Sequence, residues 1–258
     1  MHRAGIFKSS VLVDLVNYAG VPFLVIYAIS MFFYPLLAWA NWEEVQLIWD
    51  RWQSLNAAAL AFAASLIAFN ISKFNEDRQR ERDFIAAKAF LPSTLSGLMD
   101  YFLSSARIFG TFWESSGTAN SILPHHPVLP PDYREVFSNC IRHADPAVGT
   151  YLSNILVRLQ VHDARLRDMV SQADNGQAVD VDRHTLISYL YRLGELYAQI
   201  GQLFGFARGE EAFSARKLEW ENFRNAYGIF DIDTDDIFID EHMNLKEFTK
   251  RAIERSAD

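Results

Sequence analysis

An acidic cluster near the C-terminus, DIDTDDIFID over residues 231–240, holds the densest group of possible metal ligands in the sequence. Its carboxylates alternate as the first three ligands of a calcium loop do, at Asp231, Asp233 and Asp235. The pattern then fails, because Asp236 stands where glycine makes the sharp turn and His242 stands where a glutamate closes the shell. We therefore expect a short strand or turn here, with its carboxylates in water or capping a helix from 244 to 255. A metal-dependent hydrolase built on this cluster is the least favoured function.

Three other groups could carry chemistry. His125 and His126 are adjacent but have no carboxylate or thiol nearby in sequence, so an ordinary loop is favoured over a metal pair. Cys140 and His143 would share a helical face, yet a lone cysteine is more often a core residue than a nucleophile. His162 lies in an apolar seam, which favours a packing histidine with its hydrogen bonds satisfied over a ligand or switch. Phosphate-binding glycine loops and the common hydrolase motifs are absent. We expect no catalytic, cofactor-binding or metal-ligating residue, and hence a non-enzymatic protein.

The composition of the 258 residues narrows the class of protein. A net charge of -8 with only 22% charged residues argues against a nucleic-acid-binding surface over the whole chain, because neutralising phosphates needs a basic face. Half of the residues are apolar, which excludes global disorder. The single cysteine cannot form an intrachain disulfide. Nucleic acid is therefore not an expected partner.

Two long uncharged runs predict two membrane spans, at about 18–42 and 52–72. The first run has 28 residues between Asp14 and Glu43, and the second has 21 between Arg51 and Lys73. About 20 apolar residues in a helix cross the hydrocarbon core. A cleaved signal peptide is the alternative for the first run, although the run exceeds the usual apolar length of such peptides. A buried amphipathic helix is the alternative for the second.

Near these runs, two Lys and Arg residues precede the first run, one lies between the runs, and five follow the second run over residues 73–88. This distribution predicts that both termini are cytoplasmic and that the connecting segment is extracytoplasmic. The residues expected at the membrane interface are Trp42, Trp49, Trp52, Lys73, Arg78, Arg80 and Arg82. The lipid bilayer is thus an expected partner.

The second run has three faces at 100° per residue. Bulky residues expected to meet lipid are Leu55, Phe62, Leu66 and Phe69, while small residues that permit close helix approach include Ala57, Ala61 and Ser65. The third face carries Asn56, Ala63 and Asn70. Because an Asn in hydrocarbon needs a hydrogen-bond partner, these residues predict either packing against the first span or oligomerisation.

The remaining chain reads as helical, so we expect an all-α membrane protein with a two-helix transmembrane hairpin over 1–72. The segment 73–116 would hold a long stalk helix, continuous from about 52 to 90, and the first cytoplasmic helix. Four of the eight prolines predict a loop over 117–132, and 133–258 would form a helical bundle with an acidic tail.

Two apolar seams with spacings of three and four residues predict an antiparallel helix pair in the bundle. The first comprises Leu152, Ile155, Leu159, His162, Leu166 and Met169, and the second Leu186, Leu190, Leu193, Tyr197, Ile200 and Phe204. Glu210 and Glu211 after Gly209 are expected to open a further helix, which would carry four aromatic residues toward the core: Phe213, Trp220, Phe223 and Tyr227.

The pattern from Ser54 to Phe102, an Ala-rich span, a basic segment and AAKAFLPSTLSGLMDYF, resembles uncharacterised bacterial two-span inner-membrane proteins with a helical cytoplasmic domain. By architecture alone it also resembles two-span effectors of anti-phage, retron-type systems. The resemblance implies a membrane effector that oligomerises or receives a protein partner at its cytoplasmic domain and perturbs the membrane. A passive membrane anchor or scaffold is the alternative. No functional residue carries over.

Overall fold

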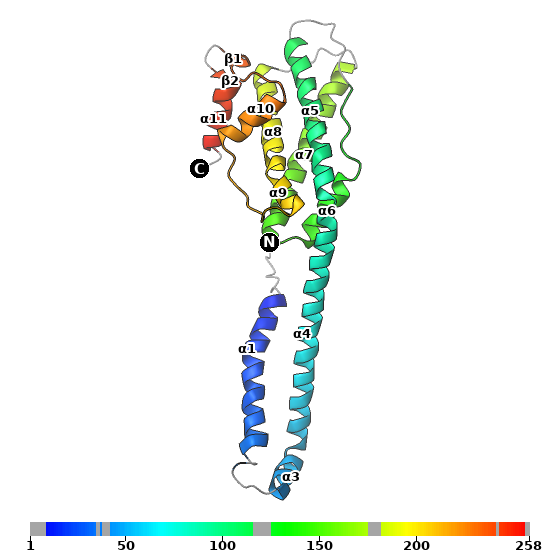
Figure 1. The fold of residues 1–258 in the computed structure, drawn as a ribbon, viewed down its shortest axis with the longest axis vertical. Helices are drawn as coiled ribbons and strands as arrows, with labels where there is room; N and C mark the ends of the chain where they lie inside the picture. The colour runs from blue at the N-terminus through cyan, green and yellow to red at the C-terminus, as the bar shows by residue number, and fades with distance from the viewer. Residues whose placement is uncertain are drawn as a thin grey trace, which may run out of the picture. The chain divides into compact units, whose positions relative to one another are not determined.

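The computed structural model describes residues 9–34, 37, 42–115, 125–174, 182–240 and 243–255. About 81% of the structure is helical and almost none is strand, so the all-α prediction is confirmed (Figure 1). The chain divides into two compact units, Met1–Arg80 and Glu81–Asp258.

The first unit pairs an N-terminal helix with the first part of a long one. Its elements are α1 (Ser9–Ala28), a π-helical turn η1 (Ile29–Phe33), α3 (Trp42–Arg51) and α4 (Gln53–Lys88), which continues into the second unit. In this unit α1 and α4 lie side by side (Figure 1). The helices approach closely at Gly20, where an added Cβ would lie 3.1 Å from the ring of Phe62.

The predicted continuous helix from 52 to 90 is confirmed by α4 to within two residues at each end. Among the described residues, one helical stretch, Gln53–Trp113, is long and apolar enough to cross a membrane, and Asn17–Met31 is a shorter apolar helix. Only 17% of the most apolar window of the long stretch is buried. A core helix would be mostly buried, so the alternative of a buried amphipathic helix for the second run is not supported.

The second unit is a helical bundle with one short strand pair. Its helices are α5 (Leu91–Ser115), α6 (Tyr133–His143), α7 (Pro146–Asp174), α8 (Arg183–Gly201), α9 (Leu203–Arg208), α10 (Trp220–Ile229) and α11 (Leu245–Arg255). Strands β1 (Phe238–Asp240) and β2 (Met243–Asn244) pair antiparallel just before α11. The expected short strand of the acidic tail is therefore present.

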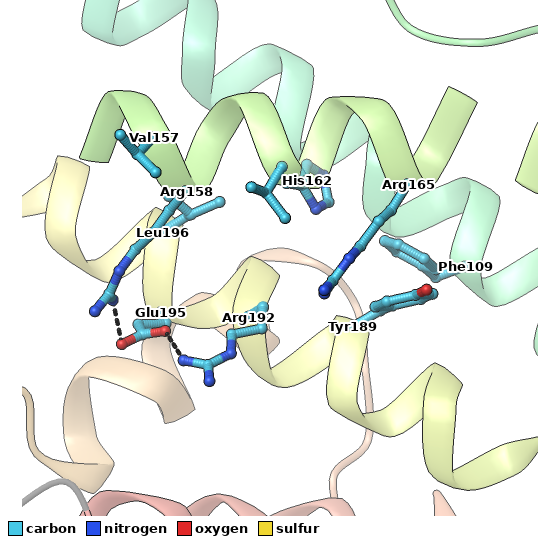
Figure 2. Close-up of a pocket in the computed structure, with 10 residues that line it drawn as sticks. Phe109, Val157, Arg158, His162, Arg165, Tyr189, Arg192, Glu195 and Leu196 are labelled. Carbon is cyan, nitrogen blue, oxygen red and sulfur yellow. Dashed lines mark hydrogen bonds and ion pairs between the residues drawn. The ribbon is translucent and has the colours of Figure 1, made fainter. Parts of the chain in front are cut away.

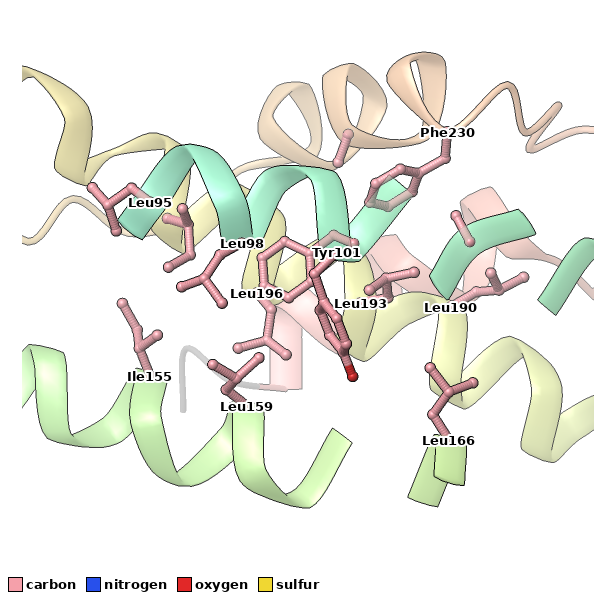
Figure 3. Packing of buried hydrophobic residues seen from close by; sticks show 14 of the residues in the cluster. Leu95, Leu98, Tyr101, Ile155, Leu159, Leu166, Leu190, Leu193, Leu196 and Phe230 are labelled. Atoms are coloured by element: carbon pink, nitrogen blue, oxygen red, sulfur yellow. The ribbon is translucent and has the colours of Figure 1, made fainter. Parts of the chain in front are cut away.

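The core of this bundle lies among α5, α7 and α8 (Figure 3). Every member of the first predicted seam is buried, and in the second Tyr197 and Phe204 are partly buried while the others are buried. From α5, Leu95, Leu98, Phe102 and Phe109 fill the same core. Pro92 occupies the first turn of α5, where its missing N–H costs no helical hydrogen bond.

The helices α7 and α8 run antiparallel. Tyr151 contacts Gln199, Arg158 contacts Glu195, and Arg165 lies over the ring of Tyr189, so the position on α8 falls as the position on α7 rises. The predicted antiparallel pair is confirmed. The connection between the helices, residues 175–181, lies outside the described residues.

The prediction that a helix begins at Glu210 is wrong. Gly209 adopts φ 78° and ends α9, and the N–H groups of Glu210 and Glu211 donate to the carbonyl of Gly205. The next helix begins only at Trp220, behind a capping box formed by Glu219 and Asn222. The two glutamates thus complete a helix C-terminus instead of starting a new helix.

The described part of the Pro-rich loop, 125–132, contains neither helix nor strand, as predicted. Pro130 packs against α5 at Gly97, where an added Cβ would come within 2.9 Å of the proline ring. Residues 117–124 lie outside the described residues.

Candidate functional site

Two asparagine side chains join α1 and α4. The amide of Asn17 donates to Oδ1 of Asn70 at 2.8 Å, and the amide of Asn70 donates to Oδ1 of Asn17 at 2.9 Å. Asn70 also donates to the carbonyl of Leu66 in its own helix. Reciprocal amide bonds of this kind satisfy groups that would otherwise be costly to remove from water.

A second polar contact lies two heptads away on α4. Asn56 is 4% exposed, accepts a hydrogen bond from the hydroxyl of Tyr27 at 2.5 Å, and donates to the carbonyl of Trp49 at 3.2 Å. The face of α4 that turns inward comprises Asn56, Ala59, Ala63, Leu66 and Asn70, which we call the hairpin seam. Its spacings of three and four residues are those of a helix pair.

The apolar residues of this unit are distributed in the opposite way to those of a water-soluble helix pair. Phe23 of α1 is 59% exposed and Ile67 of α4 is 60% exposed, and Ile26, Leu60 and Ile71 are similarly exposed. Polar amides therefore lie between the helices while large apolar side chains cover the outside. This arrangement suits a lipid environment, whereas in water it would expose a large apolar surface.

The predicted packing residues fall into two groups. Asn56, Ala63 and Asn70 lie on the hairpin seam, whereas Ala57, Ala61 and Ser65 are exposed. Leu66, which was expected to meet lipid, is instead buried in the seam at 8% exposure. Leu66 lies next to Gly20 of α1, so its side chain is covered by the partner helix and not by lipid.

The sequence reading missed Asn17 and Tyr27, the partners of the two asparagines. Both are polar residues within the first uncharged run, and this polarity could have marked them as hydrogen-bond partners of the asparagines. At the predicted interface, Trp42 and Trp52 are exposed, and Trp49 is half-buried and donates its indole N–H to the carbonyl of Met31.

The basic residues predicted at the interface follow the apolar part of α4. Lys73 is half-buried, and Arg78, Arg80 and Arg82 are exposed. Arg78 lies over the ring of Phe74, 4.9 Å from its centroid. The apolar stem of each of these side chains can cover neighbouring surface while its charge remains in water.

In the second unit, a buried carboxylate links the loop, α5 and α7. Asp163 is 5% exposed and accepts hydrogen bonds from the hydroxyl of Tyr101 at 3.0 Å and from Arg167 at 2.5 Å. Nε2 of His126 lies 3.4 Å from the same carboxylate. Burial and the charge of Asp163 raise the pKa of Tyr101, so its phenol stays protonated. The fold thus supplies His126 with the carboxylate that the sequence around it lacks.

Figure 2 shows a cavity of about 330 Å³ between α7 and α8. Three arginines line it, together with one carboxylate, a histidine and apolar side chains: Phe109, Val157, Arg158, Val161, His162, Arg165, Tyr189, Arg192, Glu195 and Leu196. Glu195 pairs with both Arg158 and Arg192, the latter at 2.8 Å. With the imidazole neutral, the cavity carries three positive charges and one negative charge.

His162 lies at this cavity and is surrounded by aromatic rings. It is 7% exposed, and its ring contacts Tyr101, Phe102 and Phe109 with centroid separations of 5.9, 6.4 and 6.0 Å. Burial lowers the pKa of His162 from 6.5 to about 4, with Asp163 acting in the opposite direction. Its buried Nε2 has no hydrogen-bond partner among the described residues. The expected packing role is present, but the expected satisfaction of its nitrogens is not.

The other predicted chemical groups are occupied by structural contacts. Asp235 pairs with the ammonium of Lys246 at 3.2 Å, and its backbone N–H donates to the carboxylate of Asp233. Over the part of the chain that the structure describes, no group of three metal-ligating side chains gathers. His242 lies outside that part. Burial raises the pKa of Cys140 to about 11, which keeps it a thiol at neutral pH.

Comparison with protein-family models, with curated proteins and with solved structures found no match to this chain.

Proposed function

We propose that this chain is a non-enzymatic, multi-pass protein of the bacterial inner membrane that holds a helical cytoplasmic domain at the bilayer. In this proposal α1 with η1 forms the first span and the apolar part of α4 forms the second. The observation that carries the proposal is the reversed polarity of the first unit, with asparagine amides between the helices and large apolar side chains outside.

The lengths of the helices agree with this proposal. The uncharged residues 15–33 of α1 and η1, at about 1.5 Å per residue, extend roughly 28 Å, close to the thickness of the hydrocarbon core. The 21 uncharged residues of the second run extend a similar distance. Both segments are helical, the conformation in which a spanning segment satisfies nearly all of its backbone hydrogen bonds, and Pro22 removes one such bond from α1.

The distribution of Lys and Arg orients the hairpin with both ends in the cytoplasm. Reporter fusions after Trp49 and after Asp258 test this topology. We expect an extracytoplasmic readout at Trp49 and a cytoplasmic one at Asp258. The same readout at both positions would show that the second run is not inserted and would contradict the two-span topology.

An effector that perturbs the membrane, as in anti-phage defence, is the more specific version of this proposal. It needs spans that associate between chains, and the amides of the hairpin seam are already used within the chain. The remaining face for association is the exposed one with Ala57, Ala61 and Ser65. Overexpression of an effector should depolarise cells, and the Ala61→Leu, Ser65→Leu double variant should relieve depolarisation at equal expression. Unchanged membrane potential with the wild-type chain would count against this version.

A passive anchor or scaffold is favoured by the same use of the amides within the chain, since it needs no contact between spans of different copies. It predicts that an unrelated two-span hairpin can replace residues 1–72 without loss of the cytoplasmic domain's function. Loss of function in a replacement that is expressed and inserted normally would exclude the passive role.

A further inference from the structure

The cavity between α7 and α8 is lined by cationic side chains from both helices. Arg158, His162 and Arg165 follow one another at four and three residues along α7, so they share the face that meets α8. Arg192 approaches from α8 (Figure 2). A helix pair that needed only apolar packing would not bring three guanidinium groups together at its contact.

The cavity has a single carboxylate to balance these charges. Glu195 is 12% exposed and is contacted by Arg158 and Arg192. Arg165 forms no ion pair within the described part of the chain, and its guanidinium lies over Tyr189, 5.6 Å from the ring centroid. The site thus keeps an excess of about two positive charges, which favours an anionic ligand.

The lining offers more than charge. Phe109 and Tyr189 lie with their ring centroids 5.9 Å apart at one end of the cavity, and Leu196 adds apolar surface beside Arg158 at the other end (Figure 2). Nε2 of His162 is enclosed by protein atoms, so the arginines supply the polar contacts for a ligand in this cavity.

We infer that this cavity binds a small organic anion in which a phosphate or carboxylate is joined to a flat ring. The anionic group is held by Arg165 and Arg192, and the ring contacts Phe109 and Tyr189. At about 330 Å³ the cavity is at the small end of ligand pockets, which suits a single-ring compound better than a peptide or a polymer. This inference concerns the second unit alone and goes beyond the proposed membrane function.

Phenyl phosphate is a small probe that has both required features. Calorimetric titration of the purified full chain in a non-ionic detergent should show binding at least tenfold tighter than that of inorganic phosphate, which lacks the ring, or of phenol, which lacks the charge. Binding no tighter than that of inorganic phosphate would overturn the inference. Because phenol also enters micelles, its heat is measured against detergent alone.

Two variants locate the binding. Arg165→Gln removes a charge-assisted contact and should weaken phenyl phosphate about tenfold or more, and Arg192→Gln should weaken it as well. Arg224→Gln is the matched control, because Arg224 pairs with Glu221 on α10 and does not line the cavity. Arg165 is exposed, so its variant should melt like the wild type. Equal affinity in wild type and Arg165→Gln would overturn the inference, whatever the topology of the hairpin proves to be.

Discussion

His162 shows how strongly burial can change one side chain. Its pKa is lowered to about 4 in the folded chain, against 6.5 for an unperturbed histidine. Between these two values the unfolded chain binds a proton that the folded chain excludes. The stability that depends on neutral His162 is therefore present above pH 6.5 and is lost as the pH falls toward 4.

We expect the free energy of unfolding to fall by about 3 kcal/mol through His162 over this pH range. The measurement is thermal unfolding from pH 7 to pH 4 in wild type and in His162→Gln. The variant should show a flatter dependence on pH, whatever its stability at pH 7. His125→Gln, which replaces an exposed histidine, should keep the wild-type dependence. A steep slope that persists in His162→Gln would assign acid sensitivity to other groups.

The reciprocal bonds between Asn17 and Asn70 predict strong coupling between the two positions. Asn70→Leu should destabilise the hairpin by about 1 kcal/mol, because it leaves the amide of Asn17 without its partner. The double variant Asn17→Leu, Asn70→Leu should recover most of this loss. Unfolding in mixed detergents measures both, with Ser65→Ala as a control at an exposed position. Additive losses in the double variant would show that the amides do not depend on each other.

At the scale of single residues, part of the site could be predicted from the sequence. The sequence pattern placed Asn56, Ala63 and Asn70 on one face because helical periodicity is a local property. It did not identify Asn17 and Tyr27 as their partners. Which residues of α1 face α4 depends on how the two helices pack at Gly20, and this is not a local property of either helix. The cavity arginines were not predicted either, because they meet only when α7 and α8 pair.

At the scale of elements, α5 provides two glycines with different surroundings. An added Cβ at Gly97 would lie 2.9 Å from Cγ of Pro130, and at Gly110 it would meet nothing within 4 Å. Gly97→Ala should destabilise the fold by about 1 to 3 kcal/mol through overpacking, partly offset by better helix propensity. Gly110→Ala, in the same helix, should be stabilising by up to about 1 kcal/mol. Chemical unfolding measures both variants, and equal effects would contradict close packing of the loop on α5.

Helix positions were predictable where the pattern of apolar residues is long, as in α4 and α7. The prediction failed between Gly209 and Trp220, where short-range capping decides. Two glutamates favour a helix start in general, but a left-handed glycine in front of them completes the preceding helix, and no helix or strand follows until the next capping box.

At the scale of the whole molecule, the core of the second unit is self-contained. Its fully buried members run from Leu91 to Leu245, within the unit that begins at Glu81. We expect residues 81–258 expressed alone to be helical and to unfold cooperatively, because these residues share one buried core. Circular dichroism and thermal unfolding test this. A gradual, non-cooperative transition would mean that the bundle needs the first unit.

The contact between Asn17 and Asn70 also has a consequence for the time course of synthesis. The two residues are 53 positions apart in the chain. At translation rates of 5 to 20 residues per second, Asn70 is made about 3 to 11 s after Asn17. For a protein inserted into the membrane as it is made, the first helix must spend those seconds with its amide satisfied by water or by the insertion machinery. The hairpin seam can close only once the second helix has emerged.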